Sequence, residues 1–121
     1  MKIGGIMNNI LVIDDEDIVL NFLRNTLAYL GYSVSVAHDG EEGVEFFNKG
    51  YNFGLVITDI SMPRMNGNAV AKCIRSSDKS DIPIVAITGS GEDDIDRGLF
   101  NFVLSKPFDL DVLLNVVRSF A

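Results

Sequence analysis

Cysteine and tryptophan are scarce in this chain. Its 121 residues include one cysteine, Cys73, and no tryptophan. A single cysteine excludes a disulfide within the chain, and low cysteine content is typical of a reducing compartment. Because Cys73 falls in a predicted helix, we expect it to be a small core residue.

Long hydrophobic runs are also missing. No stretch reaches the about 18 consecutive apolar residues that a membrane-spanning helix needs. The first residues, MKIGGIM, have neither the apolar stretch nor the small-residue cleavage site of a secretory signal. We therefore expect a cytoplasmic protein that does not contact membranes. Residues 1–8 are expected to be an N-terminal extension, and residues 9–121 a single domain.

Positive charge is in the minority. Lys and Arg total 10 residues against 17 Asp and Glu, so the formal net charge at pH 7 is −7. Such a surface repels nucleic acids and anionic membranes at long range and attracts cations and basic protein surfaces. We therefore expect no direct DNA binding by this chain.

What is present is an alternation of short β-type segments with longer helical ones. Apolar runs indicate strands at residues 10–13, 34–36, 55–57, 83–87 and 102–105. Apolar residues at helical spacing indicate helices at residues 17–30, 40–49, 67–76 and 92–99, the last of these weak, and a final helix that Asp109 caps and that ends near Phe120. The alternation predicts an α/β fold, with a five-stranded parallel sheet and helices on both faces.

Polar residues follow four of these strands directly: Asp14 and Asp15, Asp59, Thr88, and Lys106. Ligands of parallel sheets bind at that edge. An acidic pair after a strand also commonly caps the next helix, so the pair alone leaves both interpretations open. Three neighbouring carboxylates need a compensating charge, which a hard cation such as Mg²⁺ provides. With a lysine for phosphate oxygens and a threonine hydroxyl as donor, the set suits phosphoryl transfer to a carboxylate.

Three segments together resemble the receiver domains of response regulators in two-component signalling, of the chemotaxis-receiver type. They are Ile10–Glu16 (ILVIDDE), Val56–Gly67 (VITDISMPRMNG) and Ser105–Phe108 (SKPF). The likeness covers about residues 9–121. It implies a flavodoxin-like fold with strand order 2-1-3-4-5. It also implies a phosphoacceptor signalling domain rather than an enzyme, with at most its own autophosphorylation and autodephosphorylation.

The resemblance implies a role for each acidic residue of the site. Asp59 matches the phosphoacceptor. Mg²⁺, or Mn²⁺ in its place, would be held by the side chains of Asp15 and Asp59 and by the backbone carbonyl of Ser61. Asp14 would hold the metal shell, partly through water.

The remaining site residues and the partners follow from the same resemblance. Lys106 would pair with Asp59 or its phosphate, and the Lys106–Pro107 peptide bond would be cis. Thr88 would donate a hydrogen bond to the phosphate and move on activation. The phosphoryl donor would be a sensor histidine kinase or a phosphotransfer protein, and the downstream protein is not identified by the sequence.

Two departures from the family pattern concern activation. Val103 occupies the position where receivers usually carry an aromatic switch residue, and the stretch from Thr88 to Lys106 is shorter than usual. A stiff β-branched side chain cannot swing as an aromatic ring does. We therefore expect the mobile element to be the loop at residues 89–91 and the short segment after it.

Two other functions are alternatives to a phosphoacceptor domain: a binding scaffold and a phosphatase. A receiver-like scaffold could bind a partner without a phosphoryl cycle, although the complete set of site residues argues against it. A phosphatase is disfavoured, because those related enzymes usually carry a second Asp two residues after the nucleophile of the first strand.

The last helix is apolar over more than one face, which makes it a candidate homodimer surface. Its expected inward stripe is Leu110, Leu113, Leu114 and Val117, with Val112, Val116 and Phe120 on the flank.

Overall fold

One parallel sheet forms the centre of the molecule in the computed structural model, which describes residues 9–49, 52–89 and 94–120. The strands are β1 (Asn9–Ile13), β2 (Ser33–Ala37), β3 (Leu55–Asp59), β4 (Ile84–Thr88) and β5 (Phe102–Ser105). Their order is β2-β1-β3-β4-β5, and all neighbours are parallel. The predicted fold class and strand order are thus confirmed.

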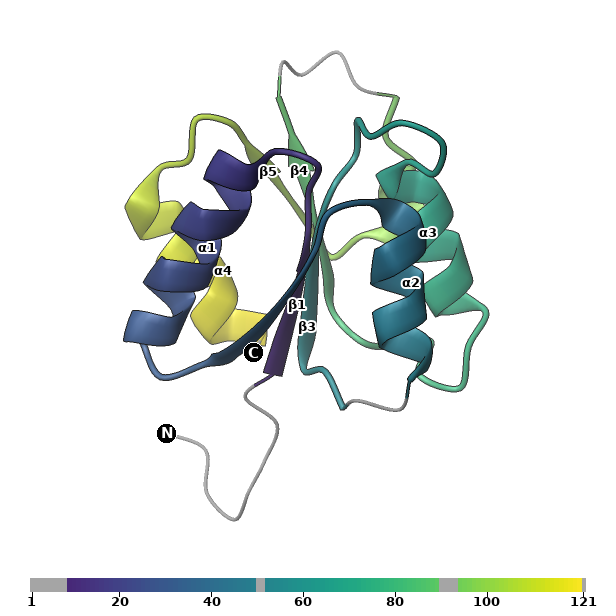
Figure 1. Cartoon of the computed structure of the whole chain (residues 1–121), viewed down its shortest axis with the longest axis horizontal. Coiled ribbons are helices and arrows are strands. Elements are labelled where there is room, and N and C mark those ends of the chain that lie inside the picture. The colour runs from purple at the N-terminus through teal and green to yellow at the C-terminus, as the bar shows by residue number, and fades with distance from the viewer. Residues whose placement is uncertain (1–8, 50–51, 90–93, 121) are drawn as a thin grey trace.

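Helices cover both faces of the sheet. They are α1 (Asp17–Tyr29), α2 (Gly40–Asn48), α3 (Gly67–Arg75) and α4 (Leu110–Phe120). α1 and α4 lie on one face, and α2 and α3 on the other (Figure 1). The side chain of Asp109 accepts a hydrogen bond from the backbone N–H of Val112 at 3.2 Å, so the predicted cap of the last helix is confirmed. No helix among the described residues is long and apolar enough to span a bilayer.

The continuous apolar runs of the central strands serve two cores at once. Ile10 and Val12 of β1 pack with α1 and α4, whereas Leu11 and Ile13 pack on the opposite face with α2 and α3. Successive side chains of a strand point to opposite faces, so a strand between two helical layers must be apolar at every position. This arrangement holds the carboxyl ends of the strands rigidly at one edge.

The connection between β4 and β5 differs from the prediction. In place of the helix expected at residues 92–99, the described part contains one 3-10 turn, η1 (Arg97–Leu99). The local sequence explains the difference, because Gly98 disfavours a helix and few apolar residues recur at helical spacing. The connection lies along α3 instead. The side chain of Asn68 donates to the carbonyl of Asp94 at 2.6 Å and accepts from the N–H of Asp96 at 2.9 Å.

Arg75, near the end of α3, fastens the other end of this connection. Its guanidinium donates to the carbonyls of Leu99, Ser80 and Ile82 at 2.6 to 3.0 Å, and to the side-chain oxygen of Asn101 at 3.0 Å. The Arg75 side chain thus joins three segments of the chain. It also donates hydrogen bonds to carbonyl groups that are not paired within a helix.

Arg75→Met should therefore lower the free energy of unfolding by about 2–4 kcal/mol, because it leaves partly buried carbonyls without donors. Urea unfolding followed by far-UV circular dichroism measures the change. Lys72→Met is the matched control, since Lys72 is an exposed cation of the same helix. Equal destabilisation by both substitutions would contradict the role of Arg75.

Two predictions about buried side chains are corrected by the structure. Cys73 is exposed rather than a core residue, because α3 turns Val70, Ala71 and Ile74 inward. In α4, Leu113 and Val117 are buried as expected, but Leu110 is 50% exposed and Leu114 is half-buried. Val116, expected on the flank, is only 7% exposed. Val116 lies one turn from Leu113 and beside Val117, so the three form one inward stripe. The homodimer surface stays a prediction, and Val116 is not part of it.

Candidate functional site

The carboxyl ends of four strands bring the predicted polar residues to one edge of the sheet. Asp14 directly follows β1, Asp59 ends β3, Thr88 ends β4, and Lys106 directly follows β5. The strand pairing holds these ends in register. For example, the backbone N–H of Lys106 donates to the carbonyl of Thr88 at 2.8 Å. The Lys106–Pro107 peptide bond is cis, as the resemblance implied.

Three carboxylates meet at this edge. One oxygen from each of Asp14, Asp15 and Asp59 lies within 4.8 Å of the other two. Asp14 is fully buried, Asp59 is only 4% exposed, and Asp15 faces solvent. The acidic pair is not simply a helix cap, since the N-cap residue of α1 is Glu16 and its side chain makes no capping bond. Hard oxygen ligands with one open, solvated side are what Mg²⁺ prefers.

Lys106 supplies the positive charge of the site. Its Nζ lies 2.6 Å from Oε1 of Glu16, 3.2 Å from Oδ2 of Asp14 and 3.7 Å from Oδ2 of Asp59. Oδ1 of Asp14 accepts a hydrogen bond from the backbone N–H of Glu16 at 2.9 Å. Oδ2 of Asp14 accepts none of good geometry, although it is buried and Lys106 is close. A buried carboxylate oxygen without a well-aligned donor is costly, and a divalent cation at this position would compensate it further than Lys106 does.

The electrostatics also favour an additional cation. Burial, and after it the charge of Asp14, raises the pKa of Asp59 to about 7, and the charge of Lys106 offsets this rise only in part. Burial likewise raises the pKa of Asp14. For Lys106, burial alone would lower the pKa, but its hydrogen bond to Glu16 and the charges of Asp14 and Asp59 raise it overall. The buried negative charge therefore exceeds what one lysine neutralises, and the donor set fits a divalent cation.

Comparison with known proteins shows which family has this sequence pattern. A family model described as the response regulator receiver domain matches residues 10–118. The chain belongs to this family. Response regulator MprA from Mycobacterium avium is 36% identical over 115 residues, which cover 91% of this chain and 49% of that protein.

Solved structures agree with this assignment. A response regulator receiver protein from Pseudomonas putida is 27% identical, with a TM-score of 0.85 over 96% of this chain and 99% of that one. Response regulator TrrA from Thermotoga maritima, solved in complex with Mg²⁺–BeF, is 35% identical, with a TM-score of 0.82 over 93% and 98% of the two chains.

The receiver domain spans about half the length of the curated relatives it matches. A probable transcriptional regulator, ycf27 from Cyanidium caldarium, is 37% identical over 107 residues, which cover 84% of this chain and 41% of that protein. The expectation that no DNA is bound directly therefore finds no support in these relatives, because some are named transcriptional regulators. The assignment of residues 1–8 as an extension stays a prediction.

In the absence of divalent cations, the stability of this receiver should fall as pH rises from about 4 to about 7. The raised pKa of Asp59 means that the folded state holds a proton there which the unfolded state has released, so deprotonation costs folding free energy. Mg²⁺ should reverse the penalty, and its stabilising effect should be larger at pH 8 than at pH 5.

Thermal unfolding with and without Mg²⁺ at these two pH values measures the effect. In Asp59→Asn protein the fall between about pH 4 and 7 should be smaller, since one of the two carboxyl groups with a raised pKa, Asp59, is gone and Asp14 remains. A Mg²⁺ effect of equal size at both pH values in wild type would contradict competition between metal and proton.

Three further predicted residues lie at or near the site, and their roles stay predictions. Ser61 lies two residues after Asp59, and its backbone hydrogen bond to the Asp59 carboxyl acts to lower the pKa of that group. Thr88 is buried at the end of β4, and Val103 is half-buried on β5. Residues 90–93 of the expected mobile element lie outside the described residues, so its mobility stays a prediction.

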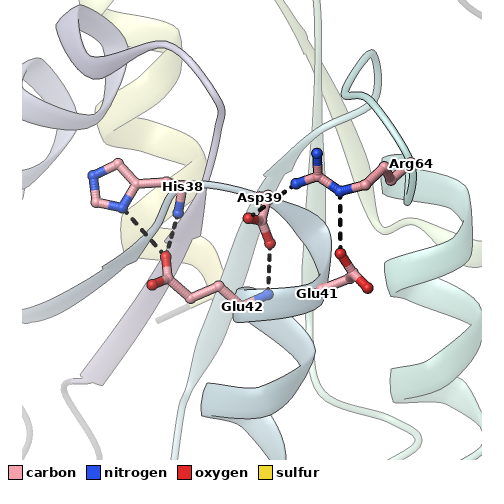
Figure 2. Close-up of polar contacts among 5 residues, drawn as sticks. All are labelled: His38, Asp39, Glu41, Glu42 and Arg64. Carbon is pink, nitrogen blue, oxygen red and sulfur yellow. Dashed lines mark hydrogen bonds and ion pairs between the residues drawn. The ribbon is translucent and has the colours of Figure 1, made fainter.

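A polar network flanks the site on the side of α2 (Figure 2). Arg64 belongs to the loop that follows β3 and has a positive φ of 65°. Its guanidinium lies 3.3 Å from Oδ2 of Asp39 and 3.2 Å from Oε1 of Glu41. Beside them, Oε1 of Glu42 accepts hydrogen bonds from His38. The network therefore ties the loop after the candidate acceptor to the start of α2.

Sequence reasoning missed two contributors to the site. Glu16 belongs to the first motif and contacts Lys106; the only signal for it in the sequence is a third acidic residue directly after the pair Asp14–Asp15. Gly67 approaches β3 closely, because a Cβ there would lie 2.4 Å from the carbonyl oxygen of Asp59. The MNG ending of the second motif is the signal for this glycine.

Proposed function

We propose that this receiver accepts a phosphoryl group on Asp59 in the presence of Mg²⁺, or Mn²⁺. The donor is a sensor histidine kinase or a phosphotransfer protein of the cytoplasm, and the signal is a changed protein contact. The observation that carries the proposal is the buried Asp59 carboxyl, which meets two further carboxylates and one lysine at the edge of a family-typical sheet. Family membership supports the two-component role, and the Mg²⁺ in the TrrA structure supports the metal.

The proposed reaction is an in-line displacement. An oxygen of the ionised Asp59 carboxylate forms a bond to phosphorus. The bond between phosphorus and the donor atom breaks, and the donor leaves with that electron pair. The side chains of Asp14, Asp15 and Asp59 would hold the metal, together with the backbone carbonyl of Ser61. When bound, the metal supplies positive charge to the phosphoryl oxygens and favours the ionised form of Asp59.

Two residues of neighbouring strands would bind the product. Lys106 is within 3.7 Å of Asp59 already, so its ammonium can reach an oxygen of the phosphoryl group by side-chain rotation alone. The hydroxyl of Thr88, at the end of the adjacent strand β4, would donate to another oxygen. Movement of Thr88 would then displace the loop that follows it, which begins at Gly89.

Intact-protein mass spectrometry after incubation with acetyl phosphate and Mg²⁺ tests the function. We expect one added phosphoryl group, which is lost when EDTA replaces Mg²⁺ during the incubation. Absence of any adduct at saturating Mg²⁺ would favour the alternative of a scaffold without a phosphoryl cycle. Rapid turnover of many phosphoesters would favour a phosphatase.

A further inference from the structure

The shortest ionic contact of Lys106 is with Glu16, which binds neither phosphate nor metal in the proposed function. Its Nζ lies 2.6 Å from Glu16, against 3.2 Å for Asp14 and 3.7 Å for Asp59. Glu16 does not belong to the cluster of three carboxylates, and its side chain makes no capping bond to α1. Among the described residues, Lys106 is thus the side chain with which the Glu16 carboxylate pairs.

The environments of the two carboxylates make this contact easy to break. The side chain of Glu16 is 61% exposed, whereas that of Asp59 is almost fully buried. The Lys106 side chain is only 18% exposed, but the carboxylate of Glu16 needs little from the pair, because water solvates it well once it is released. Phosphorylated Asp59 carries more negative charge than the free carboxylate, and the added phosphoryl group would extend toward the lysine. Lys106 would then transfer from Glu16 to the phosphoryl oxygens.

We propose that Glu16 is a positioning residue that holds Lys106 away from Asp59 until a phosphoryl group arrives. This inference rests on the proposed function. Because breaking the Glu16 contact is part of phosphorylation, Glu16 slows that step and weakens the binding of phosphoryl mimics. Hydrolysis of the adduct starts after Lys106 has moved, so Glu16 does not affect its rate.

The test compares Glu16→Gln with wild type at Mg²⁺ concentrations that saturate each protein. Glu16→Gln should bind beryllofluoride roughly three- to fivefold more tightly, the effect of removing one exposed ion pair. Its rate of phosphorylation by acetyl phosphate should rise by a similar factor, and the rate of adduct hydrolysis should stay unchanged. A substitution that merely loosens the structure would instead change both rates or lower the first.

Asp17→Asn is the matched control. It removes the same charge one residue further along, from an exposed side chain that pairs with His38 at 3.6 Å rather than with Lys106. An equal gain in both variants would assign the effect to the general field and overturn the inference, as would no gain in Glu16→Gln. Failure of the wild type to accept phosphoryl or beryllofluoride would instead overturn the proposed function.

Discussion

Asp59→Asn protein should gain no phosphoryl group from acetyl phosphate under conditions that fully label the wild type. The amide keeps the size and shape of the carboxyl but lacks the nucleophilic oxygen. The fold should remain intact, because the substitution removes a buried charge whose ionisation is already disfavoured. Intact mass and peptide mapping after labelling are the measurements.

Asp15→Asn provides the matched comparison for this result. It keeps the acceptor and removes one of the three carboxylates of the proposed metal site. Its labelling should require more Mg²⁺ and recover at high concentration, whereas that of Asp59→Asn should not recover. An adduct of wild-type yield on Asp59→Asn protein would move the acceptor to another residue.

Val116→Asp should strongly destabilise the domain. Val116 packs with Leu113 and Val117 in the core between α1, α4 and the sheet. A carboxylate there has no cation within the apolar cluster, so we expect a loss of about 3 kcal/mol or more from the free energy of unfolding. Such a loss is a large share of the about 5–15 kcal/mol typical of a domain. Urea unfolding measures it.

Val112→Asp introduces the same charge in the same helix at a side chain that is 40% exposed, and it should cost no more than about 0.5 kcal/mol. Equal losses for the two variants would show that α4 is not seated as described. The same control serves the candidate homodimer surface. If α4 mediates self-association, Val112→Asp should weaken it in light scattering without unfolding the protein.

The sequence predicts those elements whose place in the fold requires a distinctive local pattern of residues. Central strands such as β3 must be apolar on both faces, so their sequence alone marks them. The site followed from the rule that parallel strands present their carboxyl ends together, which placed Asp59 beside Asp14 from positions 45 residues apart in the sequence.

The failures have tertiary causes. Periodicity defines an apolar face of a helix only to within a residue or two, and packing against α1 and the sheet decided that Val116 rather than Leu110 is buried. The prediction that Cys73 of α3 is buried was wrong for the same reason. The contact between Glu16 and Lys106 joins residues 90 positions apart, and no local pattern encodes a choice among three nearby carboxylates.

The short connection between β4 and β5 has a consequence for how the molecule opens. Residues 94–101 form no α-helix. Their anchors are the side chains of Asn68 and Arg75, the hydrogen bonds between Asn101 and Ile84, and the packing of Leu99 and Phe100 against the core. Apart from Leu99 and Phe100, whose N–H groups bond within the 3-10 turn, amide protons there gain no protection from a helix of their own. They should exchange with solvent when α3 detaches, so α3 and the connection behave as one cooperative unit. An event that loosens α3 would therefore expose an edge of the sheet more than 20 residues further along the chain.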